Sequence, residues 1–88
     1  MSECRKEGWY RNSSGEQAYA IRLDRYTARR VIMTMGALAS AVPGGIRFNT
    51  VTGKIETARM GDWMLRRIDW NWRRISEKDF RKGWRPAE

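Results

Sequence analysis

The sequence contains no histidine and a single cysteine, Cys4, among its 88 residues. Without an imidazole the chain cannot build a Ser-His-Asp triad or a histidine metal site. One thiol also excludes an intramolecular disulfide or a cysteine zinc site. Asp62 and Asp69 could act as paired catalytic carboxylates, but each lies in a turn pattern, where Asp commonly accepts backbone N–H groups. We therefore expect no enzymatic activity, no cofactor and no metal.

Long hydrophobic runs are also missing. The longest apolar stretch runs from Met33 to Val42 and is about half of the roughly 20 residues that a membrane-spanning helix needs. Gly36 and Ser40 weaken it further, so we expect no membrane insertion. The lone cysteine and the lack of a signal-peptide pattern favour a reducing compartment, the cytoplasm.

Negative charge is scarce relative to positive charge. The chain carries 18 Lys and Arg residues against 10 Asp and Glu residues, a net charge of +8. Most of the cations are arginines, whose planar guanidinium suits phosphate or carboxylate and stacks on aromatic rings. A net charge of this size speaks to partners rather than to fold. It favours nucleic acid first and an acidic protein surface second.

The chain length fits one small domain with a compact core rich in large side chains. Residues 1–8 show no apolar pattern and predict a disordered lead-in, followed by a single domain over 9–88. Strands are expected at 9–11 and 18–23, with turn residues between them at 12–15.

A helix is predicted over 27–42, because its apolar residues recur at helical spacing. Pro43-Gly44-Gly45 would end that helix, and this Gly pair lacks the Lys-Ser/Thr of a phosphate-binding loop. Arginines crowd the start of the helix, where the helix dipole disfavours cations: Arg25, Arg29 and Arg30. They form either a solvated face or a surface placed for a partner.

The second half of the chain predicts a meander of short strands. Strands at 46–50 and 54–58 flank a hairpin turn, and further strands are expected at 63–68 and 72–75. Ser76 would cap a short helical turn through Phe80. The predicted fold class is α+β, with one helix packed on an antiparallel sheet in the order hairpin, helix, meander and C-terminal helical turn.

Aromatic and basic residues are interleaved over 63–85. Aromatic rings that stack bases, beside guanidinium groups that hold phosphates, are typical of nucleic-acid-binding surfaces. We therefore predict a partner-binding surface made of Arg66, Arg67, Trp70, Trp72, Arg73 and Arg74, together with Arg29 and Arg30 of the helix. The alternative is that Trp63, Trp72 and Trp84 are core and that arginine stems cover their rings. We favour the core for Trp63 and an exposed turn tip for Trp70.

Several short motifs resemble a family of short, uncharacterised phage and prophage proteins. They are Tyr10-Arg11 in the opening strand, Thr50-Val51-Thr52-Gly53, Gly61-Asp62-Trp63 with its apolar strand, and Phe80 followed by Trp84-Arg85-Pro86, where the family usually has Phe-x-x-x-Tyr-x-Pro. The resemblance implies a framework role for Gly61, Asp62, Trp63 and Phe80, and we add Trp84. The sequence departs from the pattern at Met60, at Trp70 (usually Gly) and over 72–77.

From these observations we expect a non-enzymatic, phage-type accessory protein of the bacterial host cytoplasm. Its basic, Trp-rich face would bind nucleic acid or a host complex that handles nucleic acid, for example as an anti-CRISPR inhibitor of a defence complex. The alternative is a structural or regulatory homo-oligomer, such as a homodimer, that self-associates through the Trp-rich hairpin.

Overall fold

The computed structural model describes residues 6–87 and confirms the α+β class. The described residues form two antiparallel sheets and two α-helices. In chain order the elements are β1 (Gly8–Asn12), β2 (Gln17–Arg22), α1 (Thr27–Met35), a 3₁₀ turn (Gly36–Leu38), β3 (Ala39–Val42), β4 (Gly45–Asn49), β5 (Ile55–Arg59), β6 (Trp63–Arg67), β7 (Trp72–Ile75), α2 (Glu77–Gly83) and β8 (Trp84–Pro86).

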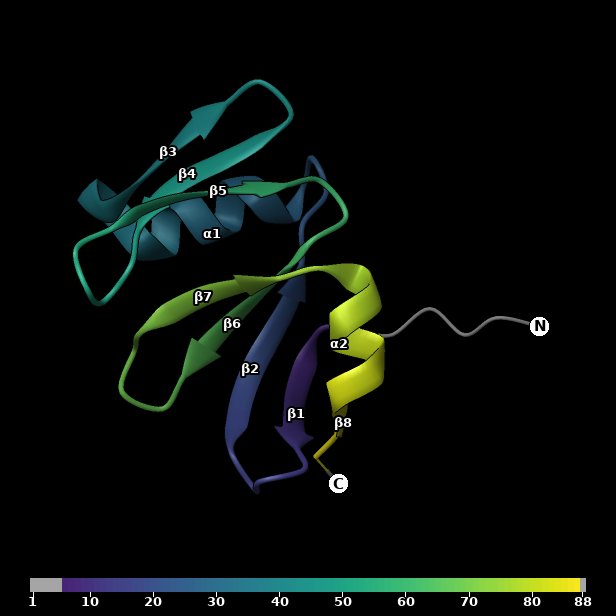
Figure 1. The fold of residues 1–88 in the computed structure, drawn as a ribbon. Coiled ribbons are helices and arrows are strands. Elements are labelled where there is room, and N and C mark those ends of the chain that lie inside the picture. Colours follow the sequence, from purple (N-terminus) through teal and green to yellow (C-terminus); the bar gives the residue numbers. More distant parts are fainter. Residues whose placement is uncertain (1–5, 88) are drawn as a thin grey trace.

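The five-stranded sheet, in the order β7-β6-β2-β1-β8, carries a hydrophobic core on each face. On one face α2 packs against β1, β2, β6 and β8. On the other face α1 and the three-stranded sheet β3-β4-β5 cover β2, β6 and β7. Figure 1 shows α1 alongside the three-stranded sheet and α2 beside β1 and β8. Strand alternation in β2 and β6 supplies both cores, because successive side chains point to opposite faces.

The smaller core is built from stacked aromatic rings. Trp63 and Phe80 stack with ring centroids 4.1 Å apart and an interplanar angle of 15°, and Tyr10 meets Phe80 edge-on at 4.8 Å. The indole N–H of Trp63 donates to Oε1 of Glu77 at 2.6 Å, which satisfies the polar edge of a buried ring. The hydroxyl of Ser76 accepts the backbone N–H of Asp79, so the predicted cap of α2 is present. The helix then continues past Phe80 to Gly83.

The helix predicted over 27–42 was wrong in its second half. It ends at Met35, where Gly36 adopts φ 67° and its N–H donates to the carbonyl of Ile32. Residues 39–42 instead form β3 and pair with β4. Pro43 and Gly44 make the hairpin turn, with Gly44 at φ 79°, as a type II turn with Pro first and Gly second requires.

The segment that is not helical contributes β3 to a separate three-stranded sheet. The strands expected as one meander divide between two sheets, because β3, β4 and β5 pair only with one another. Gly45 is needed in this sheet, since a Cβ there would lie 1.9 Å from the carbonyl oxygen of Ala58.

Residues 6–8, which the sequence analysis placed in the lead-in, take part in the described structure. Gly8 already belongs to β1, Lys6 accepts the Tyr10 hydroxyl at 2.7 Å, and Glu7 accepts the Tyr19 hydroxyl at 2.8 Å. The rest of the predicted lead-in, with Cys4, lies outside the described residues. Within 6–87, neither helix has the length and apolarity to span a membrane.

Candidate functional site

Three hairpins of the protein share one turn geometry. In each, the first residue donates its N–H to the fifth and accepts an N–H from the fourth, over Asn12–Glu16, Thr50–Lys54 and Arg67–Asn71. The fourth residue has positive φ in all three, and it is Gly15 (86°), Gly53 (86°) and Trp70 (66°). A three-residue loop ending in a left-handed residue is a common hairpin connection, and Gly normally takes that position.

Trp70 is thus a bulky residue at a glycine position. It is the one non-glycine residue with positive φ in the described part of the chain. The left-handed conformation costs a side chain with a Cβ roughly 1–2 kcal/mol. Trp70 is 62% exposed, so burial of its ring contributes little stabilising free energy to offset that cost. The ring contacts the guanidinium of Arg66, whose Cζ lies 4.1 Å from the ring centroid.

Arg66 lies among three aromatic rings. Besides Trp70, its Cζ lies 5.3 Å from the centroid of Tyr19 and 5.8 Å from that of Trp9. Strand register produces this arrangement, because Trp9 pairs with Tyr19, Tyr19 with Arg66, and Arg66 with Trp72 across four adjacent strands. Directly paired residues share a sheet face. We call this set, with Trp70 folded over it, the aromatic row: Trp9, Tyr19, Arg66, Trp70 and Trp72.

The aromatic row borders a groove of about 460 Å³ between the five-stranded sheet and α1. Met33 of α1 lies along it, 74% exposed. At one end Arg30 forms an ion pair with Glu7, which also accepts the Tyr19 hydroxyl. The hydrogen bond from Arg30 lowers the pKa of Glu7, and donation to Glu7 raises the pKa of Tyr19. Described residues lining this aromatic groove are Glu7, Tyr19, Ile21, Arg30, Met33, Thr34, Arg66, Trp70 and Trp72.

The structure brings part of the predicted partner-binding set together at this groove. Arg66, Trp70 and Arg30 line it, so one arginine from the start of α1 and the β6–β7 hairpin share one surface. Trp72 also borders it, but its side chain is 7% exposed and belongs to the larger core. Its assignment to the partner-binding surface needs correction, because α1 and the three-stranded sheet cover this position.

The remaining predicted residues lie elsewhere. Arg67 and Arg73 pair in register with Ala18 and Leu65, which face α2, so both point to the opposite side of the sheet. Arg67 is also bound to Glu16 at 3.0 Å. The other two are Arg74, which donates to Oδ2 of Asp62 at 3.1 Å, and Arg29, exposed on α1 outside the aromatic groove.

The five predicted framework residues occupy positions that suit such a role. Trp63, Phe80 and Trp84 are 1%, 0% and 4% exposed and belong to one core cluster. Gly61, at φ 97°, donates its N–H to Leu23, and Asp62 accepts the N–H of Arg59 with its carboxylate. The bond from Gly61 ties the β5–β6 turn to Leu23, just after β2, and the bond to Asp62 closes the turn itself.

Sequence reasoning missed Trp9 and Tyr19 of the aromatic row and Glu7 of the aromatic groove. Trp9 and Tyr19 lay in the predicted strands 9–11 and 18–23 without an assigned role, and Glu7 lay in the predicted lead-in. In the structure Trp9 is 44% exposed and meets Tyr19 edge-on at 5.6 Å. The signal in the sequence was the alternation of Trp9 with buried Tyr10, which points the indole away from the core formed by Tyr10.

Neither a metal-binding cluster within residues 6–87 nor a similarity to known proteins points to a further functional site. Residues 6–87 contain no group of three or more Cys, Asp or Glu side chains that could hold a metal ion. No protein-family model, curated protein or solved structure matches the chain. The resemblance to phage proteins therefore stays a prediction, and the aromatic row is the feature on which a functional proposal can rest.

Proposed function

We propose that this is a non-enzymatic nucleic-acid-binding protein that holds a single strand against the aromatic row. One observation carries the proposal: the guanidinium of Arg66 lies 4.1 to 5.8 Å from three ring centroids beside the aromatic groove, in a chain with net charge +8. Exposed rings on a sheet stack unpaired bases, and adjacent guanidinium groups contact phosphates.

The two most exposed rings of the row are suited to stacking. Trp70 is 62% and Trp9 is 44% exposed, and they come from β1 and from the β6–β7 turn. Stacking on an aromatic side chain is worth about 1–3 kcal/mol per base and tolerates any sequence. A duplex would hide its base faces from these rings, which favours a single strand.

The charge of Arg66 is available to a ligand. Ion pairs occupy Arg22, Arg30, Arg67, Arg74 and Arg81, and Arg66 forms none within residues 6–87. Its planar guanidinium already lies against Trp70, and a stacked guanidinium keeps its in-plane N–H donors free for phosphate.

Fluorescence anisotropy with a labelled 12-mer of deoxythymidine tests the proposal, with a 12-base-pair duplex as the comparison. The single strand should bind more tightly. The logarithm of its affinity should fall with log salt by about 0.7 for each phosphate neutralised. W70G should weaken binding of the single strand about tenfold or more, the loss of one stacked base.

Y26A is the matched control for that variant. Tyr26 is an exposed aromatic residue with a neighbouring guanidinium, 5.4 Å from Arg25, but it lies outside the aromatic groove. Its loss should leave affinity unchanged. Absence of binding by folded protein at about 50 mM salt, or equal affinity of W70G and the parent, would refute the proposal.

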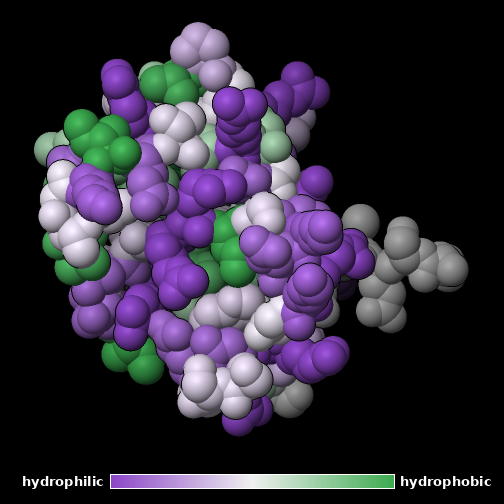
Figure 2. All heavy atoms as spheres, in the orientation of Figure 1, coloured by the Kyte–Doolittle hydropathy of each residue, from purple (hydrophilic) through white to green (hydrophobic). Residues whose placement is uncertain are grey.

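Self-association through the Trp-rich hairpin is a second candidate, favoured by the exposure of its tip. Ile68 is 73% and Trp70 is 62% exposed, and β7 forms an edge of its sheet. The face shown in Figure 2 is mainly hydrophilic, with apolar side chains in separate patches. This pattern argues against a large obligate interface on that face. Light scattering over a hundredfold concentration range decides the point: a constant monomer mass excludes the homodimer. A monomer that binds no oligonucleotide would instead point to a protein of a host nucleic-acid-handling or defence complex.

A further inference from the structure

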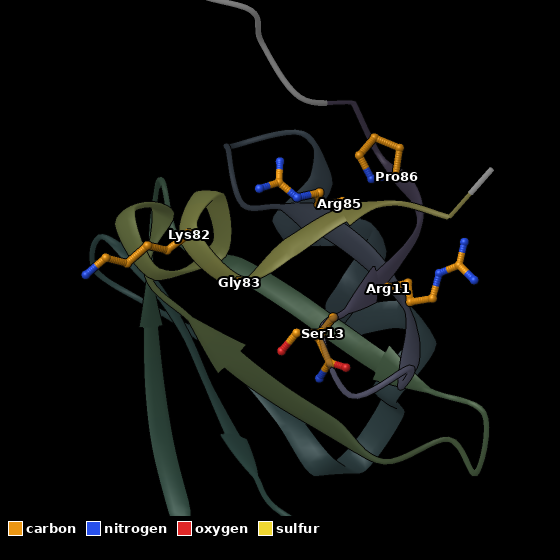
Figure 3. Close-up of a pocket in the computed structure, with 7 residues that line it drawn as sticks. Arg11, Ser13, Lys82, Gly83, Arg85 and Pro86 are labelled. Atoms are coloured by element: carbon orange, nitrogen blue, oxygen red, sulfur yellow. The ribbon is translucent and has the colours of Figure 1, made fainter.

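A second, strongly basic hollow lies at the β8 edge of the five-stranded sheet. It has a volume of about 430 Å³ and lies where the β1–β2 turn meets the end of α2. Its lining includes Arg11, Lys82 and Arg85, with Ser13 and Asn12 as further polar groups, and no Asp or Glu among the described lining residues. Figure 3 shows the three cationic side chains spread around the hollow and pointing away from one another.

Two of these cations lie directly opposite each other. Arg11 of β1 pairs in register with Arg85 of β8. Like charges at opposed positions destabilise an antiparallel pair. Neither arginine forms an ion pair within residues 6–87, and Arg11 donates only a long hydrogen bond, 3.4 Å, to the carbonyl of Ala87. The edge hollow, which we define by Arg11, Lys82 and Arg85, therefore concentrates positive charge that no described carboxylate neutralises.

Two residues of the edge hollow, Arg11 and Arg85, share a sheet face with the aromatic row, whereas Lys82 comes from α2 on the other face. Trp9 and Arg11 alternate with buried Tyr10, so their side chains leave β1 on the same side, about 7 Å apart along the strand. Arg85 shares that face as the cross-strand partner of Arg11. From Arg66 in β6 to Arg85 in β8 the sheet advances by three strand spacings, about 14 Å.

We propose that Arg11 and Arg85 bind backbone phosphates of the same single strand whose bases stack on Trp9 and Trp70. The strand would cross the sheet at right angles to β1 and β2, from the β6–β7 turn to the β8 edge. Phosphates of the strand would accept charge-assisted hydrogen bonds from the two guanidinium groups and offset the positive charge concentrated there. This inference rests on the proposed function. It adds to that function the place where the strand's phosphates are held, at the β8 edge beside the rings that stack its bases.

The test uses the double variant R11Q/R85Q and the matched control R47Q/R59Q. Arg47 and Arg59 are exposed arginines of the three-stranded sheet, so the control removes the same charge away from the site. For the deoxythymidine 12-mer, R11Q/R85Q should reduce the slope of log affinity against log salt by about 1.4, the value for two phosphates on a single strand. The control should lower the slope by less than half of that.

A 12-mer of abasic nucleotides separates phosphate contacts from base contacts. R11Q/R85Q should weaken binding of both oligomers, whereas W70G should weaken binding of the deoxythymidine oligomer alone. Removal of the like-charge pair should leave the thermal midpoint unchanged or raised, which circular dichroism checks.

The outcomes distinguish the two proposals. If the parent binds the 12-mer but R11Q/R85Q keeps its salt slope, the edge hollow is not part of the site and the proposed function stands. If the control loses as much slope as the double variant, the effect is one of net charge and the inference fails. If the parent binds neither oligomer, both proposals fail.

Discussion

Replacing Trp70 by Gly and, separately, by Ala distinguishes backbone strain at the β6–β7 turn from the contact of its ring with Arg66. Both variants lose the cation–π contact at 4.1 Å, worth about 0.5–1 kcal/mol at an exposed site. The Ala variant keeps the strain of a Cβ at φ 66°, roughly 1–2 kcal/mol. The Gly variant relieves that strain, at a cost of about 0.5–1 kcal/mol in unfolded-state entropy.

The glycine variant should therefore be more stable than the alanine variant, the reverse of the usual order. W70G should be more stable than W70A by about 0.5–1 kcal/mol, and close to the parent in its free energy of unfolding. Urea unfolding followed by far-ultraviolet circular dichroism measures the difference. Ile68 lies in the same turn, and it is not among the residues with positive φ. There I68A should be more stable than I68G. If W70A is as stable as W70G or more stable, Trp70 does not adopt the left-handed conformation and the reasoning is refuted.

Three other substitutions or conditions probe the fold. F80A should lower stability by about 3–5 kcal/mol and leave little cooperative unfolding, whereas a sharp melt near the parent temperature would remove Phe80 from the core. G45A should disrupt the three-stranded sheet, because the new Cβ would lie 1.9 Å from the Ala58 carbonyl oxygen; an unchanged amide spectrum of β3–β5 would contradict this. The pKa of Glu7 is lowered by its hydrogen bond from Arg30 and that of Asp24 by backbone N–H groups at the start of α1. Since a lowered folded-state pKa stabilises the fold above the ordinary carboxyl values of 4.5 and 3.8, melting temperature should fall as pH drops below that range, and E7Q should lose part of this dependence.

Local sequence patterns predicted the hairpins better than the extent of the helix. Gly15 and Gly53 lie in the predicted turns and occupy their left-handed position, and Trp63 is buried in the core, as predicted. The helix prediction was wrong for the segment from Leu38 to Val42, because the spacing of its apolar residues fits both one face of a helix and a four-residue strand. The positive φ of Gly36 and the pairing of β3 with β4 decided between the two.

The candidate site depended on pairings that local patterns do not contain. Alternation places Arg66 and Arg67 on opposite faces, but only the register of β2 with β6 brings Tyr19 to Arg66. The pairing of β1 with β2 then adds Trp9. Trp72 was predicted as a surface residue because nothing nearby in the sequence shows that α1 covers it.

The pairing of β1 with β8 has a mechanical consequence. These strands are antiparallel neighbours, and the N–H of Ala87 donates to the carbonyl of Trp9 at 3.0 Å. A force applied through Gly8 and Ala87 would thus open the pair like a zipper, one hydrogen bond at a time, instead of shearing several bonds at once. In a force spectrometer the β8 strand should peel away at low force, well before the aromatic core around Trp63 yields.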